Sequence, residues 1–258
     1  MSPFGSPKTF QKRHNLDPDG DILLILHNPN APFAVWNPDW YKEVIPSLSD
    51  QSDAESQDSD SSEVDHQTQS EAHSDTEQSS PASDQSTSTS SEVKFRVSSK
   101  HLCLASEYFK RLLRGPWKEA TSISEDGLRH VDAYHWDEEA MLTLMQIIHG
   151  RNYQLPWRPT LESLAKIAVL VDYYKCYEAV SLWAVKCWSF INVSNVFGRD
   201  TILGMLVGQV FEDFRLFDKA TRVAMKECPG KLPTLGLPLT TTAEIRCEAE
   251  EVLGSDIY

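Results

Sequence analysis

A serine-rich acidic segment from Ser47 to Glu92 divides this chain of 258 residues into two apolar parts. The segment holds sixteen serines and twelve acidic residues, and it has no lysine, arginine or aromatic residue. Such a segment has too few apolar side chains to offset the entropy lost on ordering, so we predict that it is disordered. A globular fold must then join residues on either side of it. The entropic cost of closing so long a loop rises only with the logarithm of its length.

The same segment explains the charge of the chain. The formal net charge is −14, but residues outside the segment carry 26 acidic against 24 basic side chains. Binding to nucleic acid needs a basic face to meet phosphate groups, and a nearly neutral remainder gives it little support, so we expect no direct nucleic-acid partner. No apolar run is long enough to span a bilayer, and the first fifteen residues lack the hydrophobic stretch of a secretory signal, so we expect no membrane partner.

The cysteines indicate a reducing compartment. Their number is odd and no pair has CxxC spacing, which favours free thiols in a cytoplasmic or nuclear protein. The five are Cys103, Cys176, Cys187, Cys228 and Cys247.

Before the acidic segment, the sequence predicts one β-hairpin. Residues 1–18 are polar and rich in proline, which predicts a flexible N-terminal arm. The apolar run Ile22–Leu26 predicts a buried strand, and residues 28–30 form a turn signal. We expect Phe33–Trp36 to return as the second strand of the hairpin.

After the acidic segment, the stretch from Phe95 to Gly115 predicts a strand that runs into two short helices. Phe95 and Val97 alternate as in a half-buried strand, and Ser106 is suited to cap the second helix. Gly115 followed by Pro116 would end that helix. Its apolar face would consist of Tyr108, Phe109, Leu112 and Leu113.

Later patterns predict mostly helices. A weak strand pattern covers residues 127–132, and apolar faces with helical spacing cover residues 137–150, 161–174 and 180–191. Residues 192–258 read as a helical C-terminal extension. The sequence therefore predicts an α+β fold.

The spacing Val97–Ser98–x3–Leu102–x3–Ser106–x2–Phe109 resembles the signature of the BTB/POZ domain, a protein–protein interaction module. The resemblance is strongest to the small stand-alone BTB proteins of filamentous fungi. It implies a BTB/POZ fold, in which a small sheet is flanked by a helical cluster. Here that fold would be interrupted by the long disordered acidic insertion and followed by the helical extension.

Two later stretches also resemble this family. Ile147–Gly150 is similar to the end of its middle helix, and Ile167–Cys176 to the helix after it. Ser98 departs from the pattern, since most members carry histidine there. The implied division of the chain is a flexible arm at 1–18, a first part of the domain at 19–46, the insertion at 47–92, the remainder of the domain at 93–191 and the extension at 192–258.

The resemblance implies a binding function without catalysis. The chain would be a non-catalytic adaptor or scaffold that acts through self-association and recruitment of protein partners. One alternative is a substrate-receptor subunit of a cullin-type ubiquitin ligase. Another alternative is a transcriptional or chromatin-associated scaffold, although no zinc-finger spacing is present.

The resemblance also implies two sets of contact residues. Family members commonly form homodimers through their first strand and the helices around this signature, so Leu102, Leu104 and Phe109 are the candidates for self-association, with part of this set needed for the core of the domain itself. Members that bind the cullin scaffold carry a hydrophobic-x-Glu motif in a loop. Trp117 and Glu119 match it, with Trp117 as the apolar anchor and Glu119 as a charged contact.

The acidic segment offers candidate phosphorylation sites. Ser52, Ser62 and Ser74 each have an acidic residue three positions later, a pattern that acid-directed kinases modify. The alternative is a solvated spacer that is never phosphorylated. The sequence holds no HExxH, GxSxG or phosphate-loop motif, so we predict no catalytic, cofactor-binding or metal-binding residues and no enzyme.

Overall fold

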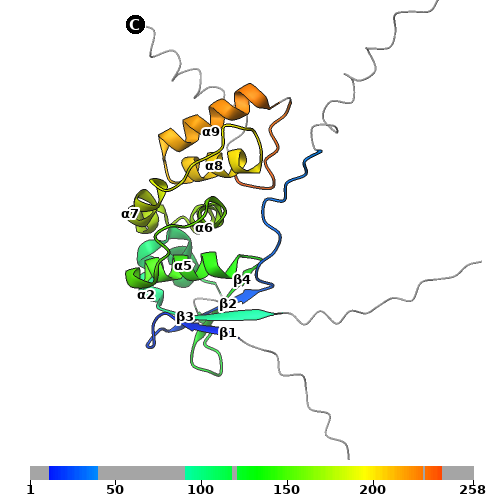
Figure 1. Cartoon of the computed structure of the whole chain (residues 1–258). Coiled ribbons are helices and arrows are strands. Elements are labelled where there is room, and N and C mark those ends of the chain that lie inside the picture. The colour runs from blue at the N-terminus through cyan, green and yellow to red at the C-terminus, as the bar shows by residue number, and fades with distance from the viewer. Residues whose placement is uncertain (1–11, 40–90, 118–120, 229, 240–258) are drawn as a thin grey trace, which may run out of the picture.

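The computed structural model describes residues 12–39, 91–117, 121–228 and 230–239, which form an α+β fold. The sheet lies at one end of the molecule, and the helices are stacked in layers away from it (Figure 1). The strands are β1 (Lys12–Asn15), β2 (Ile22–His27), β3 (Glu92–Val97) and β4 (Arg129–Tyr134). The α-helices among these residues are α2 (Ser99–Ala105), α3 (Glu107–Arg114), α5 (Glu138–Ile148), α6 (Leu161–Tyr174), α7 (Tyr177–Trp188), α8 (Arg199–Val210) and α9 (Phe214–Glu227), and a short 3-10 helix covers Asn152–Gln154.

The sheet joins strands from both sides of the acidic segment, as the sequence predicted. Its order is β1-β3-β2-β4. In the centre, Leu24 of β2 lies opposite Phe95 of the antiparallel β3 and opposite Val131 of the parallel β4. The residues from Ile22 to Leu26 are all buried, because β2 is covered on both faces. The prediction of a buried strand at this position is therefore confirmed.

The predicted hairpin before the segment is wrong. Residues 33–36 form no strand, and the antiparallel neighbour of β2 is β3. Positive φ values at Asn30 (62°) and Ala34 (45°) break the extended backbone that a strand requires. The carbonyls of Phe33 and Ala34 instead accept hydrogen bonds from Arg199 of α8, at 3.2 and 2.8 Å. The apolar residues of this loop thus lie against a helix and do not extend the sheet.

The predicted N-terminal arm is also partly wrong. Residues 12–15 form β1, which pairs in parallel with β3. The ring of His14 stacks on Phe95 at 5.0 Å, and its Nε2 lies 2.8 Å from Glu138. Leu16 is buried, and its carbonyl accepts a hydrogen bond from Arg151 at 2.9 Å. Long-range contacts therefore fix this short polar strand, whereas residues 1–11 lie outside the described residues.

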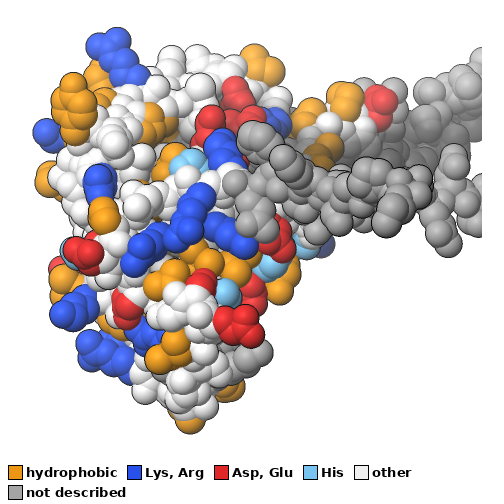
Figure 2. All heavy atoms as spheres, turned by 90° about the horizontal axis from the view of Figure 1, so that it is seen from below, with side chains coloured by type: hydrophobic (Ala, Val, Ile, Leu, Met, Phe, Trp, Pro, Cys, Tyr) orange, Lys and Arg blue, Asp and Glu red, His pale blue; other side chains and the backbone are white. Residues whose placement is uncertain are grey.

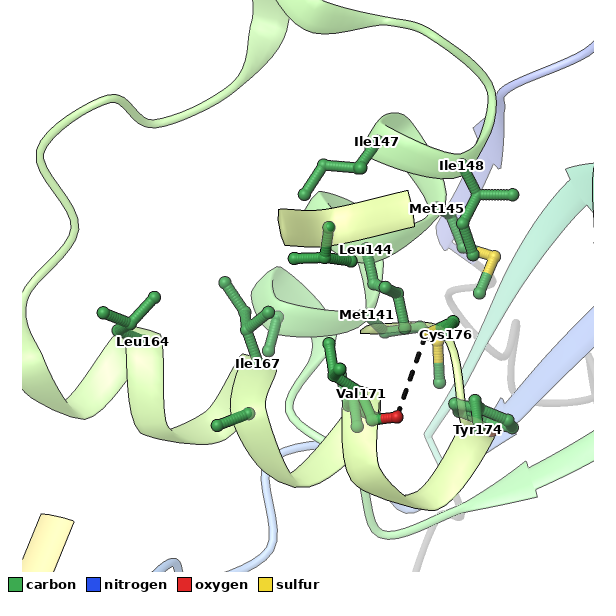
Figure 3. Close-up of a cluster of buried hydrophobic side chains, with 14 of the residues drawn as sticks. Met141, Leu144, Met145, Ile147, Ile148, Leu164, Ile167, Val171, Tyr174 and Cys176 are labelled. Carbon is green, nitrogen blue, oxygen red and sulfur yellow. Dashed lines mark hydrogen bonds between the residues drawn. The ribbon is translucent and has the colours of Figure 1, made fainter. Parts of the chain in front are cut away.

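Helices α5 and α6 form the centre of the core. Figure 3 shows Met141 and Leu144 of α5 beside Ile167 and Val171 of α6, with Ile148 farther along α5. These side chains are at most 8% exposed, so the helical faces read from the sequence are confirmed. Side-chain oxygens cap both helices: Asp137 accepts from the Ala140 N–H and Thr160 from the Ser163 N–H.

The C-terminal extension continues this core. Helix α8 lies between α6 and α9 in the stack (Figure 1). A Cβ at Gly208 would lie 2.6 Å from the backbone nitrogen of Phe217, so glycine allows α8 and α9 to approach closely. Residues 240–258 lie outside the described residues, as do residues 47–90 of the acidic insertion. Among the helices that the structure describes, none is long and apolar enough to cross a membrane.

Figure 2 shows the sheet end of the molecule, where lysine and arginine side chains gather next to hydrophobic ones. Two adjacent strands supply cations to the sheet here. Arg13 of β1 lies opposite Lys94 of β3, and Arg96 follows two positions later on the same face of β3. This sheet-end group is a basic surface of the described part of the chain, separate from the site considered next.

Candidate protein-binding groove

An open groove of about 640 Å³ lies between α3, the turn after it and the end of α6. We call it the α3 groove. It exists because α3 is amphipathic: Phe109 and Leu113 point into the core, whereas the flanking side chains remain accessible. The groove is lined by Glu107, Tyr108, Arg111, Leu112, Trp117, Tyr173 and Lys175.

Beneath the lining of the α3 groove, the floor is a buried and closely packed pair of rings. Phe109 is fully buried and stacks on the nearly buried ring of Tyr174 at 4.7 Å with an interplanar angle of 13°. Ser106 links the same two residues: its Oγ accepts the Phe109 N–H at 3.1 Å and donates to the Tyr174 carbonyl. Burial raises the pKa of Tyr174 far above its usual range, so its hydroxyl stays neutral. The start of α3 and the end of α6 are therefore fixed to each other.

The walls of the α3 groove are aromatic. The ring centroids of Tyr108 and Tyr173 lie 5.3 Å apart, and the Tyr173 ring packs edge-on against Trp136 with a centroid distance of 5.2 Å. Trp117 is 59% exposed and folds back over Gly115, where an added Cβ would lie 2.7 Å from its Cδ1 atom. Glycine at position 115 therefore allows this indole to reach the groove.

The surroundings of the α3 groove are basic. Lys110, Arg111 and Arg114 lie on α3, and Lys175 follows α6 in the left-handed conformation with φ of 50°. The carboxylates beside them are Glu107, which lies 3.3 Å from Lys110 and 3.5 Å from Arg111, and Asp172, which lies 2.7 Å from Lys175. Among the described residues, four cations thus lie near two carboxylates, and each carboxylate already contacts a cation.

The candidates for self-association separate into two groups. Leu102 and Phe109 are both 0% exposed, so they are the part of this set that the core of the domain needs, and they offer no surface to a second copy in this fold. They belong to the core instead, because α2 and α3 need them to pack on the sheet and α6. Leu104 of α2 is 88% exposed and is available to a partner. Self-association itself stays a prediction.

The remaining site predictions are only partly placed. Trp117 lines the α3 groove, but its predicted companion Glu119 lies outside the described residues. Ser52, Ser62 and Ser74 also lie outside them. Sequence reasoning missed Tyr173 and Lys175, because only the packing of α6 against α3 brings them to Trp117. The one signal available was the adjacent pair Tyr173-Tyr174, of which one ring is buried and the other is 48% exposed.

A second exposed apolar region lies on and near α7. We call Trp157, Leu182, Val185 and Phe190 the α7 patch; their exposed fractions lie between 43% and 73%. Cations of the chain already cover two of its rings: the Arg158 guanidinium lies 4.7 Å from the Phe190 ring and the Lys186 amine 5.7 Å from Trp157.

Titratable side chains in the described part of the chain form ion pairs, and His27 takes part in two of them. His27 lies between Glu92 at 3.4 Å and Asp132 at 2.8 Å, and His130 lies 2.9 Å from Asp126. No group of three or more His, Cys, Asp or Glu side chains among the described residues could hold a metal ion. These pairs join neighbouring strands and turns of the sheet.

The chain was also compared with known proteins. It matches no model of a protein family, and no curated protein matches its sequence. The resemblance to the BTB/POZ domain therefore depends on the residue spacing described above. Within the described residues, the chain is an α+β protein that presents an aromatic groove above a buried, closely packed pair of rings.

Proposed function

We propose that this chain is a BTB/POZ-type interaction module that recruits a protein partner through the α3 groove and acts as a non-catalytic adaptor. The order of its elements supports the family assignment: two strands that flank the acidic insertion, two short helices, a further strand and then a series of helices. The described cysteines are free, which supports a cytoplasmic or nuclear location.

The observation that carries this proposal is the exposed Trp117 at an aromatic groove with a buried floor. Tryptophan and tyrosine dominate the energy of many protein interfaces, because their large rings fill pockets at a small cost in entropy. A rigid floor lowers that cost further, since binding does not need to order it. The α3 groove supplies both conditions.

The test is affinity capture from a cell lysate with the full chain, followed by mass spectrometry. Wild type is compared with Trp117→Ala and with Trp157→Ala, the matched control, because Trp157 is an exposed tryptophan of the α7 patch. We expect Trp117→Ala to lose a defined set of partners that Trp157→Ala retains. An unchanged partner set in Trp117→Ala, with native circular dichroism, contradicts the proposal.

Self-association through α2 is the second part of the adaptor function. Leu104 is the exposed apolar residue that supports it. We expect a dimer in light scattering that Leu104→Ser converts to monomer, because a polar side chain weakens a self-complementary apolar patch. Monomeric wild type at every concentration rejects this part.

A cullin scaffold is a second candidate partner, favoured by the accessibility of Trp117. The chain would then be a substrate-receptor subunit of a ubiquitin ligase. Co-purification with the cullin of the host cell tests this function. We expect Trp117→Ala to reduce recovery of the cullin; equal recovery from wild type and variant removes the candidate.

A further inference from the structure

We propose that the α3 groove selects an acidic peptide segment that carries one bulky apolar side chain. The inference rests on the proposed function of the groove and names the chemical class of its partner. The apolar side chain would enter between the rings, and the flanking carboxylates would meet the cations beside them.

The apolar half of the recognition comes from the lining. Tyr108, Trp117 and Tyr173 present partly exposed rings, and Leu112 adds an aliphatic side chain between them. A volume of about 640 Å³ falls in the range of about 300–1,000 Å³ that is typical of ligand pockets. The groove therefore has room for an anchor side chain together with part of the peptide that carries it.

The acidic half comes from cations on both walls. The side chain of Arg111 on α3 is 79% exposed, and that of Lys175 after α6 is 65% exposed. Lys110 and Arg114 add positive charge along α3, and the carboxylates that contact these cations among the described residues are Glu107 and Asp172. A ligand carboxylate would gain charge-assisted hydrogen bonds from Arg111 or Lys175, and a basic peptide would meet net repulsion.

The backbone fixes α3, which carries Arg111, relative to the end of α6, which precedes Lys175. The Ser106 Oγ joins the start of α3 to the Tyr174 carbonyl, one residue before Lys175. The Lys175 N–H donates to the Val171 carbonyl and closes α6 in a left-handed turn. The fixed backbone sets the distance between the two Cα atoms that carry these cations, which favours a definite spacing of acidic residues in the partner, although the exposed Arg111 and Lys175 side chains still lose rotamer freedom on binding.

The acidic insertion of the chain itself has the charge but lacks the anchor. Residues 47–92 hold twelve acidic residues and no aromatic residue. We therefore assign the groove to a separate partner and expect the insertion to bind more weakly. This comparison is one arm of the test.

The test uses fluorescence anisotropy with the full chain and labelled twelve-residue peptides. The first peptide carries four Glu around a Leu-Phe pair, the second replaces Glu by Gln, the third replaces Glu by Lys, and the fourth is residues 51–62 of the insertion. We expect the first peptide to bind at least about tenfold more tightly than each of the others, a difference that shrinks at high salt.

Variants then locate the binding surface. The double variant Arg111→Gln/Lys175→Gln should weaken binding of the first peptide about tenfold, and Trp117→Ala by a similar factor. Arg13→Gln is the matched control, because Arg13 is an exposed cation of the sheet-end group. It should change binding less than about twofold, since rim charges far from a ligand are screened.

Each result decides the inference. Equal binding of the Gln peptide, or an equal loss in Arg13→Gln, overturns selection of acidic segments by this groove. Tighter binding of the insertion peptide overturns the separate partner. Absence of peptide binding while partner capture still depends on Trp117 rejects the acidic class and leaves the proposed function intact. Loss of the dependence on Trp117 in both assays rejects both.

Discussion

The α3 groove and the α7 patch expose similar side chains, but they differ in what lies beneath and above the rings. In the α3 groove, the rings rest on the stacked pair of Phe109 and Tyr174, and the Ser106 hydroxyl satisfies polar atoms at the floor. In the α7 patch, Arg158 covers Phe190 and Lys186 covers Trp157. An incoming side chain must displace these cations before it reaches the ring faces that they cover.

The comparison teaches that exposure alone does not identify a binding surface. A cation–π contact at an exposed site is worth about 0.5–1 kcal/mol, so the chain already uses part of the binding capacity of the α7 rings. Trp188 of α7 also has a buried Nε1 that finds no hydrogen-bond partner among the described residues. The α3 groove combines open rings with a satisfied floor, and the following variants test that contrast.

The largest difference should appear in stability. Phe109→Ala removes a fully buried ring from the floor of the α3 groove, and we expect a loss of about 3–5 kcal/mol in the free energy of unfolding. Leu182→Ala on the α7 patch should change it by less than about 0.5 kcal/mol, because Leu182 is 73% exposed. Urea denaturation measures both. Similar losses in the two variants would show that the side chains beneath the α3 groove contribute no more to the free energy of unfolding than those of the α7 patch.

The next difference concerns one hydroxyl group. Ser106→Ala removes the cap of α3 and the bond to the Tyr174 carbonyl, which leaves two buried polar groups without this partner. We expect a loss of about 2 kcal/mol. Ser181→Ala is the control, because the Ser181 Oγ donates to the Glu178 carbonyl at an exposed position of α7. Equal urea midpoints for the two variants would contradict a special role for Ser106.

Local sequence patterns predicted those elements whose contacts follow from their own periodicity. The apolar run of β2 and the helical faces of α5 and α6 are such cases, because each buries a continuous stripe or strand. The loop at residues 33–36 misled the prediction, since its carbonyls bind Arg199, which comes much later in the chain. Strand β1 was missed for a similar reason. Its position depends on contacts with β3 and Glu138, which are distant in sequence, and its four polar residues show no alternation of apolar and polar side chains.

The candidate site was predicted less completely than the fold. Trp117 was identified only through the resemblance to a family, and the sequence did not show which of Leu102, Leu104 and Phe109 the core needs. The sequence of a short helix does not show which of its apolar side chains are buried in the core and which remain on the surface. Lys175 could not be foreseen at all, because its place at the groove follows from how α6 ends beside α3.

A smaller effect should follow from uncovering the α7 rings. Arg158→Ala together with Lys186→Ala removes both cations, and we expect a stability loss of about 0.5–1 kcal/mol. The exposed rings should also bind more of a hydrophobic dye and increase light scattering at high concentration. Unchanged dye binding would mean that these cations do not cover the patch in solution, and the contrast with the α3 groove would weaken.

The smallest effect should come from pH, through His149 at the end of α5. Its Nδ1–H donates to the Met145 carbonyl at 2.8 Å and its Nε2 accepts the Ser98 N–H at 2.9 Å, so the folded chain needs the neutral ring. Burial, assisted by the nearby His101 and Arg151, lowers the pKa of His149 below its ordinary value.

The unfolded chain therefore binds a proton at this ring more readily than the folded chain does. The contribution of His149 to stability is present above a pH of about 6.5 and is lost as the pH falls through the lower pKa of the folded state. Because Ser98 precedes α2, hydrogen exchange should rise in α2 and α3 before it rises in α7 between pH 7.5 and 5.5. His149→Gln should reduce this pH dependence, since a glutamine oxygen can accept the Ser98 N–H at any pH. The same acid response in wild type and variant would assign this response to another titratable group. Earlier exchange in α7 than in α2 and α3 would show that the α7 patch opens before the α3 groove does.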